Sequence, residues 1–330
     1  MRKPPTILRN PQRKPSNLRN LGSSERGDGK SKDDRAIIRR LRIKNIPRLQ
    51  EIFWDSVGFV EEDNYITKLS LCAKNLKEIP PFIFDLNKIT SLNLRSNRIT
   101  VIPPKIRNLK NLKVLILENN RIDSLPSEIF ELSELEYLDL DGNDLEILSP
   151  AIEKLKNLKK LYLSHNQLHF LPNELTRLSD LRLIYANDNR LEVLPSSIGD
   201  LNCLTTIWVK NNMLRTIPLS FKNLTTLQRY DLSNNPWQDP GTEIISKGLG
   251  AIQHYLEEKR VQKIIRLVRA IRSDIPVLSE EDFFESILHF RTLLEHNIKK
   301  NRNHIACKVQ EHLLDRSYVK LPKSELGIYL

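Results

Sequence analysis

The sequence predicts an α/β solenoid, in which short parallel strands on one side alternate with short helices or helical turns on the other. Asparagine recurs with a fixed spacing of 23 residues, at Asn97, Asn120, Asn143, Asn166, Asn189, Asn212 and Asn235. Each asparagine occupies the same place in the pattern L-x-x-L-x-L-x-x-N-x-L, and no insertion or deletion interrupts the series. An uninterrupted period of this length is typical of stacked structural repeats in which each unit contacts its neighbours.

The repeat unit accounts for both halves of each coil. In the unit around Asn166, Leu161 and Leu163 alternate with polar or aromatic neighbours, as in a strand with one buried face. The asparagine follows where the chain turns, and we expect its amide to bond the backbone and to form a ladder between coils. The second half reads L-P-x-x-I-x-x-L and predicts a short helix on the convex side, with proline at its first position. The unit is that of a leucine-rich-repeat solenoid with parallel strands on its concave face.

The pattern divides the chain into five segments. They are a basic disordered tail (1–32), a helical N-terminal flank or cap (33–65), about eight repeats (66–237), C-terminal capping helices (238–272) and a small helical segment of unknown role (273–330). In the first flank, apolar residues from Ala36 to Phe53 recur at near-helical spacing, and Pro47 ends or kinks the helix. A partner-binding helix is the alternative interpretation of this stretch.

After the last repeat, the apolar residues between Ile244 and Leu256 predict one amphipathic helix that closes the open end of the array. Residues 254–272 then place apolar side chains on one arc of a helix and basic side chains on another. A capping helix is the favoured interpretation, and a membrane-surface or calmodulin-type target helix is the alternative.

Composition predicts a cytoplasmic protein, with the nucleus as the alternative location. The chain has 39% hydrophobic and 28% charged residues, no run of about 18 apolar residues, and no apolar core of a signal peptide in its first 30 residues. Its three cysteines, Cys72, Cys203 and Cys307, are far apart in the sequence. We therefore expect reduced thiols rather than a disulfide framework.

Positive charge is concentrated in the N-terminal tail. Residues 1–50 contain 15 Lys and Arg against 4 Asp and Glu, so the remainder of the chain is neutral in sum. A basic tail of this kind can bind acidic membrane, nucleic acid or an acidic protein, or it can serve only as a solubilising segment. No aromatic residue precedes Phe53 to stack on a base, which favours the solubilising role.

Equal repeats allow the outward strand positions to be compared from coil to coil. One column brings Tyr162, Tyr185 and Trp208 into successive coils, about 5 Å apart, and Asp139, Asp141 and Asp144 form an acidic patch on its N-terminal side. An exposed aromatic strip with a charged rim resembles a protein-binding hot spot. The candidate partner-binding residues are Tyr137, Asp139, Asp141, Lys160, Tyr162, Leu183, Tyr185, Trp208, Lys210 and Arg229. The alternative is that these aromatic rings only cover one another along the sheet.

The residue pattern gives no basis for catalysis. The seven histidines are scattered, no Gly-rich phosphate loop is present, and no set of His and Cys has the spacing of a zinc site. Cys307 with the nearby His304 is weak support for a nucleophile. We therefore expect a protein without enzymatic activity, cofactor or metal. An enzyme confined to residues 273–330 and targeted by the repeats is retained as an alternative.

The unit ending L-P-x-x-I-x-x-L and the exit sequence Asn234-Asn235-Pro236-Trp237 resemble those of intracellular Ras-related leucine-rich-repeat proteins. That group comprises the Ras-scaffolding Shoc type, the Ras suppressor protein and the plant Ras-group repeat proteins. The resemblance covers residues 66 to about 256. It implies a non-enzymatic intracellular scaffold or adaptor in signal transduction, whose concave face binds a protein partner such as a small GTPase or a signalling complex. A nucleic-acid-associated adaptor that uses the basic tail is a further alternative.

Overall fold

The computed structural model describes residues 34–40, 46–52 and 55–273. The chain forms two compact units, Met1–Asp239 and Pro240–Leu330, and each is described by itself below. Predictions for the basic tail, for His304 and Cys307, and for the segment after residue 273 lie outside the described residues.

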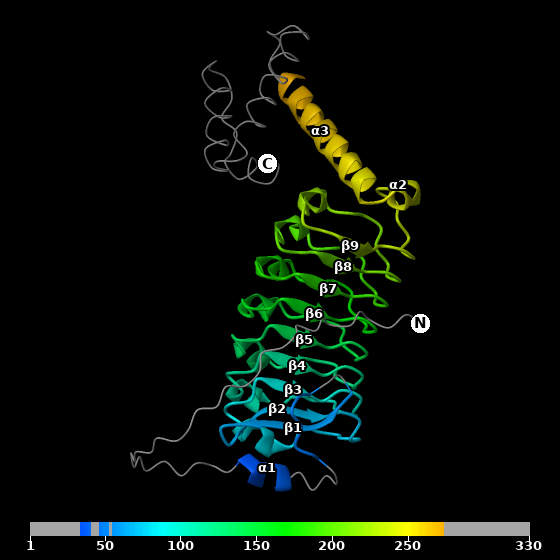
Figure 1. Ribbon diagram of the computed structural model, residues 1–330. Coiled ribbons are helices and arrows are strands. Elements are labelled where there is room, and N and C mark those ends of the chain that lie inside the picture. Colours follow the sequence, from blue (N-terminus) through cyan, green and yellow to red (C-terminus); the bar gives the residue numbers. More distant parts are fainter. Residues whose placement is uncertain (1–33, 41–45, 53–54, 274–330) are drawn as a thin grey trace, which may run out of the picture. The chain divides into compact units, whose positions relative to one another are not determined.

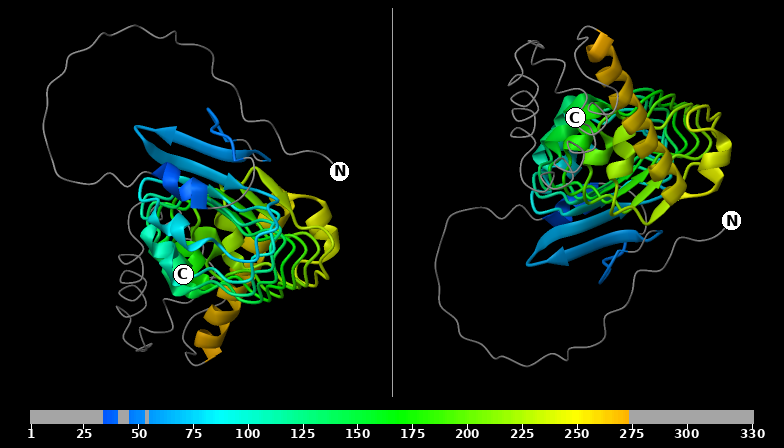
Figure 2. Two further views of the ribbon diagram at one scale, coloured as in Figure 1. Left: turned by 90° about the horizontal axis from the view of Figure 1, so that it is seen from below. Right: turned by 90° about the horizontal axis from the view of Figure 1, so that it is seen from above.

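The first unit is built on a nine-stranded sheet whose strands follow one another in sequence order (Figure 1). The strands are β1 (Val57–Glu62), β2 (Tyr65–Leu71), β3 (Ser91–Asn93), β4 (Val114–Ile116), β5 (Tyr137–Asp139), β6 (Lys160–Tyr162), β7 (Leu183–Tyr185), β8 (Thr206–Trp208) and β9 (Arg229–Asp231). All neighbours from β2 to β9 pair in parallel. The predicted leucine-rich-repeat solenoid is confirmed, and its coils lie one behind another in the views of Figure 2.

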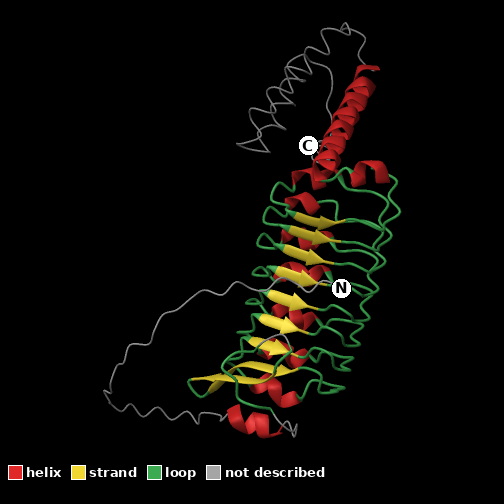
Figure 3. Cartoon of the chain, turned by 45° about the vertical axis from the view of Figure 1, so that its right-hand side comes forward, coloured by secondary structure: helices red, strands yellow, loops and turns green. Residues whose placement is uncertain are grey.

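A short 3-10 helix follows each of the strands β2 to β8 and lies behind the sheet (Figure 3). These helices are η1 (Pro81–Asp85), η2 (Pro104–Asn108), η3 (Ser127–Glu131), η4 (Pro150–Lys154), η5 (Asn173–Arg177), η6 (Ile198–Asp200) and η7 (Leu219–Asn223). In η3 the repeat proline lies one residue earlier than predicted, since Pro126 precedes the helix with extended backbone at φ −67° and ψ 150°. The core lies between the two layers, where Leu161, Leu163 and Ile152 are fully buried.

The seven repeat asparagines join each coil to the one before it. The side-chain Nδ2 of Asn120 donates to the carbonyl oxygens of Leu94 in the preceding coil, at 3.0 Å, and of Leu117 in its own coil, at 2.9 Å. Its Oδ1 accepts from the backbone N–H of Ile99 at 3.0 Å. All seven asparagines make the equivalent bond to a carbonyl 26 residues earlier. The amide thereby satisfies backbone groups that the turn leaves without a sheet partner, and it fixes the spacing between coils.

The N-terminal edge of the sheet is closed by a hairpin that the sequence did not reveal. β1 pairs antiparallel with β2 through the two-residue turn Asp63-Asn64, and both turn residues have positive φ, as type I′ hairpins require. Helix α1 (Asp34–Arg40) is much shorter than the predicted stretch. A carboxylate oxygen of Asp34 accepts from the backbone N–H of Ile66 at 2.9 Å, which ties α1 to the first coil.

The second unit contains two described helices, α2 (Thr242–Ser246) and α3 (Leu249–Ser273), where the sequence predicted a single helix from Ile244 onward. Gly248 separates them with φ +95°, a conformation that interrupts a right-handed helix and that glycine adopts with little strain. Ile252 and Leu256 of α3 are buried. No helix in the described part of the chain is both long and apolar enough to cross a membrane.

Candidate functional site

The strand face, by which we mean the concave side of the sheet that points away from the leucine core, collects the candidate binding residues. Because β6, β7 and β8 pair in register, Tyr162 is opposite Tyr185 and Tyr185 is opposite Trp208. The three side chains project from equivalent positions of consecutive coils, since successive strand residues point to opposite faces. Each of the three residues is half-buried.

Four rings form one continuous row on this face, which we call the aromatic ladder: Tyr137, Tyr162, Tyr185 and Trp208. Their centroids follow at 5.0, 5.0 and 4.7 Å, with interplanar angles of 32°, 82° and 31°. These separations lie within the range in which aromatic pairs attract one another beyond simple burial. Tyr137 joins from a different column, because its register partner in β6 is Lys160 and its ring reaches Tyr162 diagonally. The Nζ of Lys160 lies 5.8 Å from the Tyr137 ring centroid, within cation–π range.

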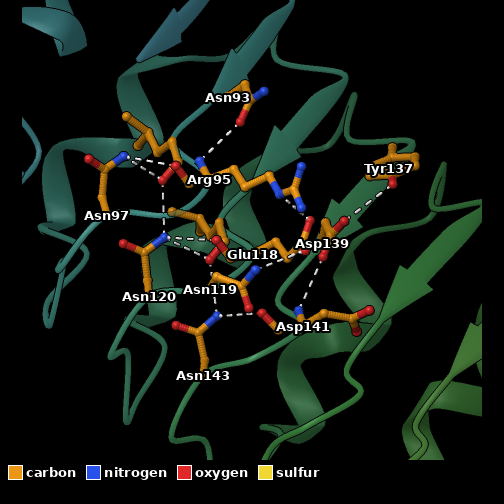
Figure 4. A network of polar contacts seen from close by, with 12 residues as sticks. Asn93, Arg95, Asn97, Glu118, Asn119, Asn120, Tyr137, Asp139, Asp141 and Asn143 are labelled. Carbon is orange, nitrogen blue, oxygen red and sulfur yellow. Dashed lines mark hydrogen bonds and ion pairs between the residues drawn. The ribbon is translucent and has the colours of Figure 1, made fainter. Parts of the chain in front are cut away.

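Three carboxylates gather beside the first ring, and we call Glu118, Asp139 and Asp141 the carboxylate cluster (Figure 4). Asp139 is only 1% exposed; its Oδ2 accepts from the Tyr137 hydroxyl at 3.3 Å and its Oδ1 from the backbone N–H of Asp141 at 3.1 Å. Arg95, one coil earlier, approaches Glu118 with 2.9 Å between Nε and Oε2. The cluster therefore consists of partly or fully desolvated acids next to an aromatic surface.

Burial governs the protonation of this cluster. The pKa of Asp139 is raised to about 7 and that of Asp141 to about 8, chiefly by removal from water; the Coulombic repulsion of Asp139 contributes to the rise at Asp141, and that of Glu118 contributes to both. Burial also raises the pKa of Glu118, while Arg95 counteracts that change. In the ladder, desolvation raises the pKa of Tyr162 to about 12 and moves those of Tyr137 and Tyr185 upward. The tyrosine hydroxyls consequently remain neutral hydrogen-bonding groups at physiological pH.

The other end of the strand face is basic. Arg229 is exposed on β9, and its charge acts on the hydroxyl of Tyr185, lowering the pKa of that group against the effect of burial. Lys210 follows β8 and is half-buried, as is Leu183, which pairs with Lys160 in the sheet register. The candidate residues therefore lie on one face, with the acids and Lys160 at one end of the ladder and Lys210 and Arg229 at the other.

The sequence grouping of the acids is corrected in one respect. Asp144 was placed with Asp139 and Asp141, but it lies exposed on the turn after Asn143, and Glu118 is the carboxylate that acts on both. Arg95 was missed as the partner of Glu118. The available signal was the column of residues that directly follow the second leucine of each strand pair. Arg95, Glu118 and Asp141 occupy this column in consecutive coils.

The described ranges offer little for metal or thiol chemistry. No group of three or more His, Cys, Asp or Glu within them is placed to hold a metal ion. Cys72 and Cys203 are free thiols there. Burial raises the pKa of Cys72, which lowers the fraction of this thiol that is ionised.

Comparison with known proteins supports the assignment of the repeats. A leucine-rich-repeat family model matches residues 87–145 and 110–168. Comparison with curated protein sequences gives no significant match.

Three solved structures illustrate the structural similarity. The leucine-rich-repeat ectodomain of the Arabidopsis thaliana receptor kinase GASSHO1/SCHENGEN3, in complex with CASPARIAN STRIP INTEGRITY FACTOR 2, is 32% identical over 48% of this chain and 20% of its own, with a TM-score of 0.46. A leucine-rich-repeat protein of Leptospira interrogans is 30% identical over 54% of this chain and 57% of its own, with a TM-score of 0.36. Internalin C2 of Listeria monocytogenes is 26% identical over 53% of this chain and 74% of its own, with a TM-score of 0.49. The chain thus spans less than two thirds of the length of the first two.

Proposed function

We propose that this chain is a non-enzymatic scaffold that binds a protein partner through the aromatic ladder of its strand face. The observation that carries the proposal is the row of four half-buried rings, each 4.7 to 5.0 Å from the next. Tyr and Trp dominate the binding energy of protein interfaces because they bury a large apolar area and still offer a polar atom.

The ladder is also held in place before a partner arrives. Each ring packs on its neighbour, and the strands beneath are fixed by parallel pairing and by the asparagine ladder. A preorganised surface loses little conformational entropy on binding, so more of the contact energy remains as affinity. Charged residues at both ends, such as Asp141 and Arg229, supply the polar rim that orients a partner.

The test compares partner capture by the native chain with capture by the double variant Tyr185→Ala/Trp208→Ala. Truncating two clustered hot-spot rings is expected to weaken binding by several kcal/mol while the leucine core stays intact. Phe170→Ala/Val193→Ala is the matched control, because Phe170 and Val193 are also neighbours in consecutive coils, are 46% and 53% exposed, and lie outside the strands of the sheet. Proximity labelling measures partner capture by the native chain and by both double variants. Equal capture by the native chain and the ladder variant would contradict the proposal.

We further propose an intracellular, cytoplasmic role in small-GTPase signalling, which rests on the resemblance of the repeat unit and of the exit sequence at Trp237. Trp237 is buried, and its Nε1 donates to the carbonyl of Leu232 at 2.9 Å, so the exit sequence has a structural role. A panel of small GTPases in both nucleotide states, presented to the native chain and to the ladder variant in a biolayer binding assay, tests the assignment. Binding to none of them would remove the GTPase assignment and leave protein binding itself standing.

A further inference from the structure

The charge on the strand face changes from negative to positive along the direction of the ladder. At β4 and β5 the carboxylate cluster holds three acids, and Arg95 approaches one of them, Glu118. At β8 and β9 two bases, Lys210 and Arg229, accompany one acid, Asp231. Between these ends the face is lined by neutral rings, with the Lys160 ammonium over the ring of Tyr137. An occupant that lies along the ladder therefore meets negative charge at one end and positive charge at the other.

The negative charges of Asp139 and Asp141 are not needed to hold the backbone. In β3 the equivalent residue of Asp139 is Asn93, which is equally buried and whose Oδ1 accepts from the N–H of Arg95 at 3.0 Å. Asp139 makes the same bond to Asp141 at 3.1 Å. A neutral amide therefore satisfies this position of the coil as well as a carboxylate does.

The same comparison applies to the second acid. The Oδ1 of Asp141 accepts from the backbone N–H of Ser164 in the next coil, and Asn187 accepts the equivalent bond from Lys210 at 2.9 Å. The fold thus carries ionisable groups at two positions where asparagine serves elsewhere in the same chain. Burial makes their ionised forms unfavourable in the free protein. A bound cation would offset this cost of ionisation, which gives a physical reason for the two acids at these positions.

Apart from the charged side chains of Glu118, Arg95 and Lys160, the two acids are flanked by neutral groups. Tyr137 and Tyr162 flank them, Ser164 follows in the next coil, and the Lys160 ammonium lies over the Tyr137 ring. The positive charge of Arg95 lowers the pKa of Asp139, but the ion pair of Arg95 is with Glu118. Among the described residues, no ion pair joins a cation to Asp139 or Asp141.

We infer that the occupant of the strand face is an extended protein segment that presents an arginine or lysine side chain to the half-buried Asp141, beside the buried Asp139, and an apolar side chain to Tyr185 and Trp208. This inference rests on the proposed function and specifies the partner. The long stem of the basic side chain packs against Tyr162, because the Lys160 ammonium already lies over the Tyr137 ring. A phosphate backbone or an anionic membrane would instead bring negative charge against the carboxylate cluster.

The geometry also sets the spacing in the partner. Asp139 and Trp208 are three strands apart, which is roughly 14 Å at about 4.8 Å per strand. An extended chain advances about 3.3 Å per residue, so about four residues separate the basic residue from the apolar one. Residues beyond the apolar one approach Lys210 and Arg229 and are expected to be acidic or neutral.

The experiment selects binders from a displayed library of random twelve-residue peptides against the full chain at pH 8 and low salt. We expect enrichment of peptides with Arg or Lys about four residues from an aromatic or leucine residue. These peptides should bind Asp139→Asn/Asp141→Asn at least about tenfold more weakly. Asp231→Asn is the matched control, because Asp231 makes the same backbone bond, to Ser233 at 3.0 Å, at the other end of the face, and it should retain affinity within about threefold.

The possible outcomes separate the inference from the proposed function. Peptides that lose binding to Tyr185→Ala/Trp208→Ala but contain no basic residue, and that bind the asparagine variant normally, overturn the inference and leave the proposed function intact. Peptides that bind both variants normally, or a library that yields no binder to the strand face, overturn both. Each single variant, Asp139→Asn and Asp141→Asn, is measured as well. Because Asn93 and Asn187 occupy equivalent positions, at least one single variant should fold and report the effect of the charge.

Discussion

Replacing Asp139 with asparagine should stabilise the protein at alkaline pH and leave its stability nearly unchanged under acidic conditions. The carboxyl group has an ordinary pKa of 3.8 and a folded-state pKa of about 7, because burial disfavours its ionised form. Between these two values the folded state holds a proton that the unfolded state has lost. The free energy of unfolding therefore falls as the pH rises through this window.

The magnitude follows from the difference between the two pKa values. About three pH units correspond to at most about 4 kcal/mol at 1.36 kcal/mol per unit. Asp141 titrates in the same region, with a pKa of about 8, and the two acids interact, so their effects do not add. We expect Asp139→Asn to raise the free energy of unfolding by about 1 to 4 kcal/mol at pH 8.5 and by less than about 0.5 kcal/mol at pH 4.

Urea denaturation of the native chain, of Asp139→Asn and of Asp231→Asn across pH 4 to 9 measures this effect. The Asp231 variant controls for the loss of one negative charge from an equivalent but less buried position on β9. Comparing variants at each pH removes the contributions that all three proteins share, including those of Glu136 and Glu153, whose lysine and arginine partners lower their pKa values. A stability difference for Asp139→Asn that is the same at pH 4 and pH 8.5 would refute the reasoning.

Three further predictions concern the scaffold and the tail. Asn143→Ala removes four hydrogen bonds, three of them buried, and should cost about 3 kcal/mol in chemical denaturation, whereas Asn143→Asp keeps the acceptor for the N–H of Ile122 but turns an oxygen toward three carbonyl oxygens and should cost at least as much; a clearly smaller loss for Asn143→Asp would argue against the role of the donor. Gly248→Ala should lower the melting temperature because of its φ of +95°, whereas Gly250→Ala, in helix α3 with open space around it, should raise it; shifts of the same sign would contradict this account. Deleting residues 1–32 should abolish any steeply salt-dependent binding to DNA or RNA, and unchanged binding of the truncated chain would exclude the basic tail as its cause.

The regular features of the fold were predictable because every coil has the same length. With no insertion between Asn97 and Asn235, the position of a residue within its unit fixes its place in the sheet. The sheet register accordingly places Tyr185 between Tyr162 and Trp208. The identity of the core also follows from the repeat, since the leucines of the pattern are the residues that alternate toward the interior.

Features that depend on contacts across the repeat were not predictable in this way. The diagonal approach of Tyr137 to Tyr162 depends on where each ring swings above the sheet, which a column of residues does not specify. The choice of Glu118 rather than Asp144 as the third acid has the same origin, because the two differ in direction and exposure rather than in distance along the chain.

The sequence by itself determined the period, the leucine core, the asparagine positions and the column that holds three of the four rings, because these are set by local spacing repeated without interruption. Only the tertiary structure decided that β1 closes the first coil as a hairpin, that Gly248 separates α2 from α3, and that Asp139 is buried while still carrying an ionisable group. Burial and edge pairing arise from side chains and strands that meet only after folding. Spacing along the chain therefore identifies the strand face, and the packing above it sets its charge and chemistry.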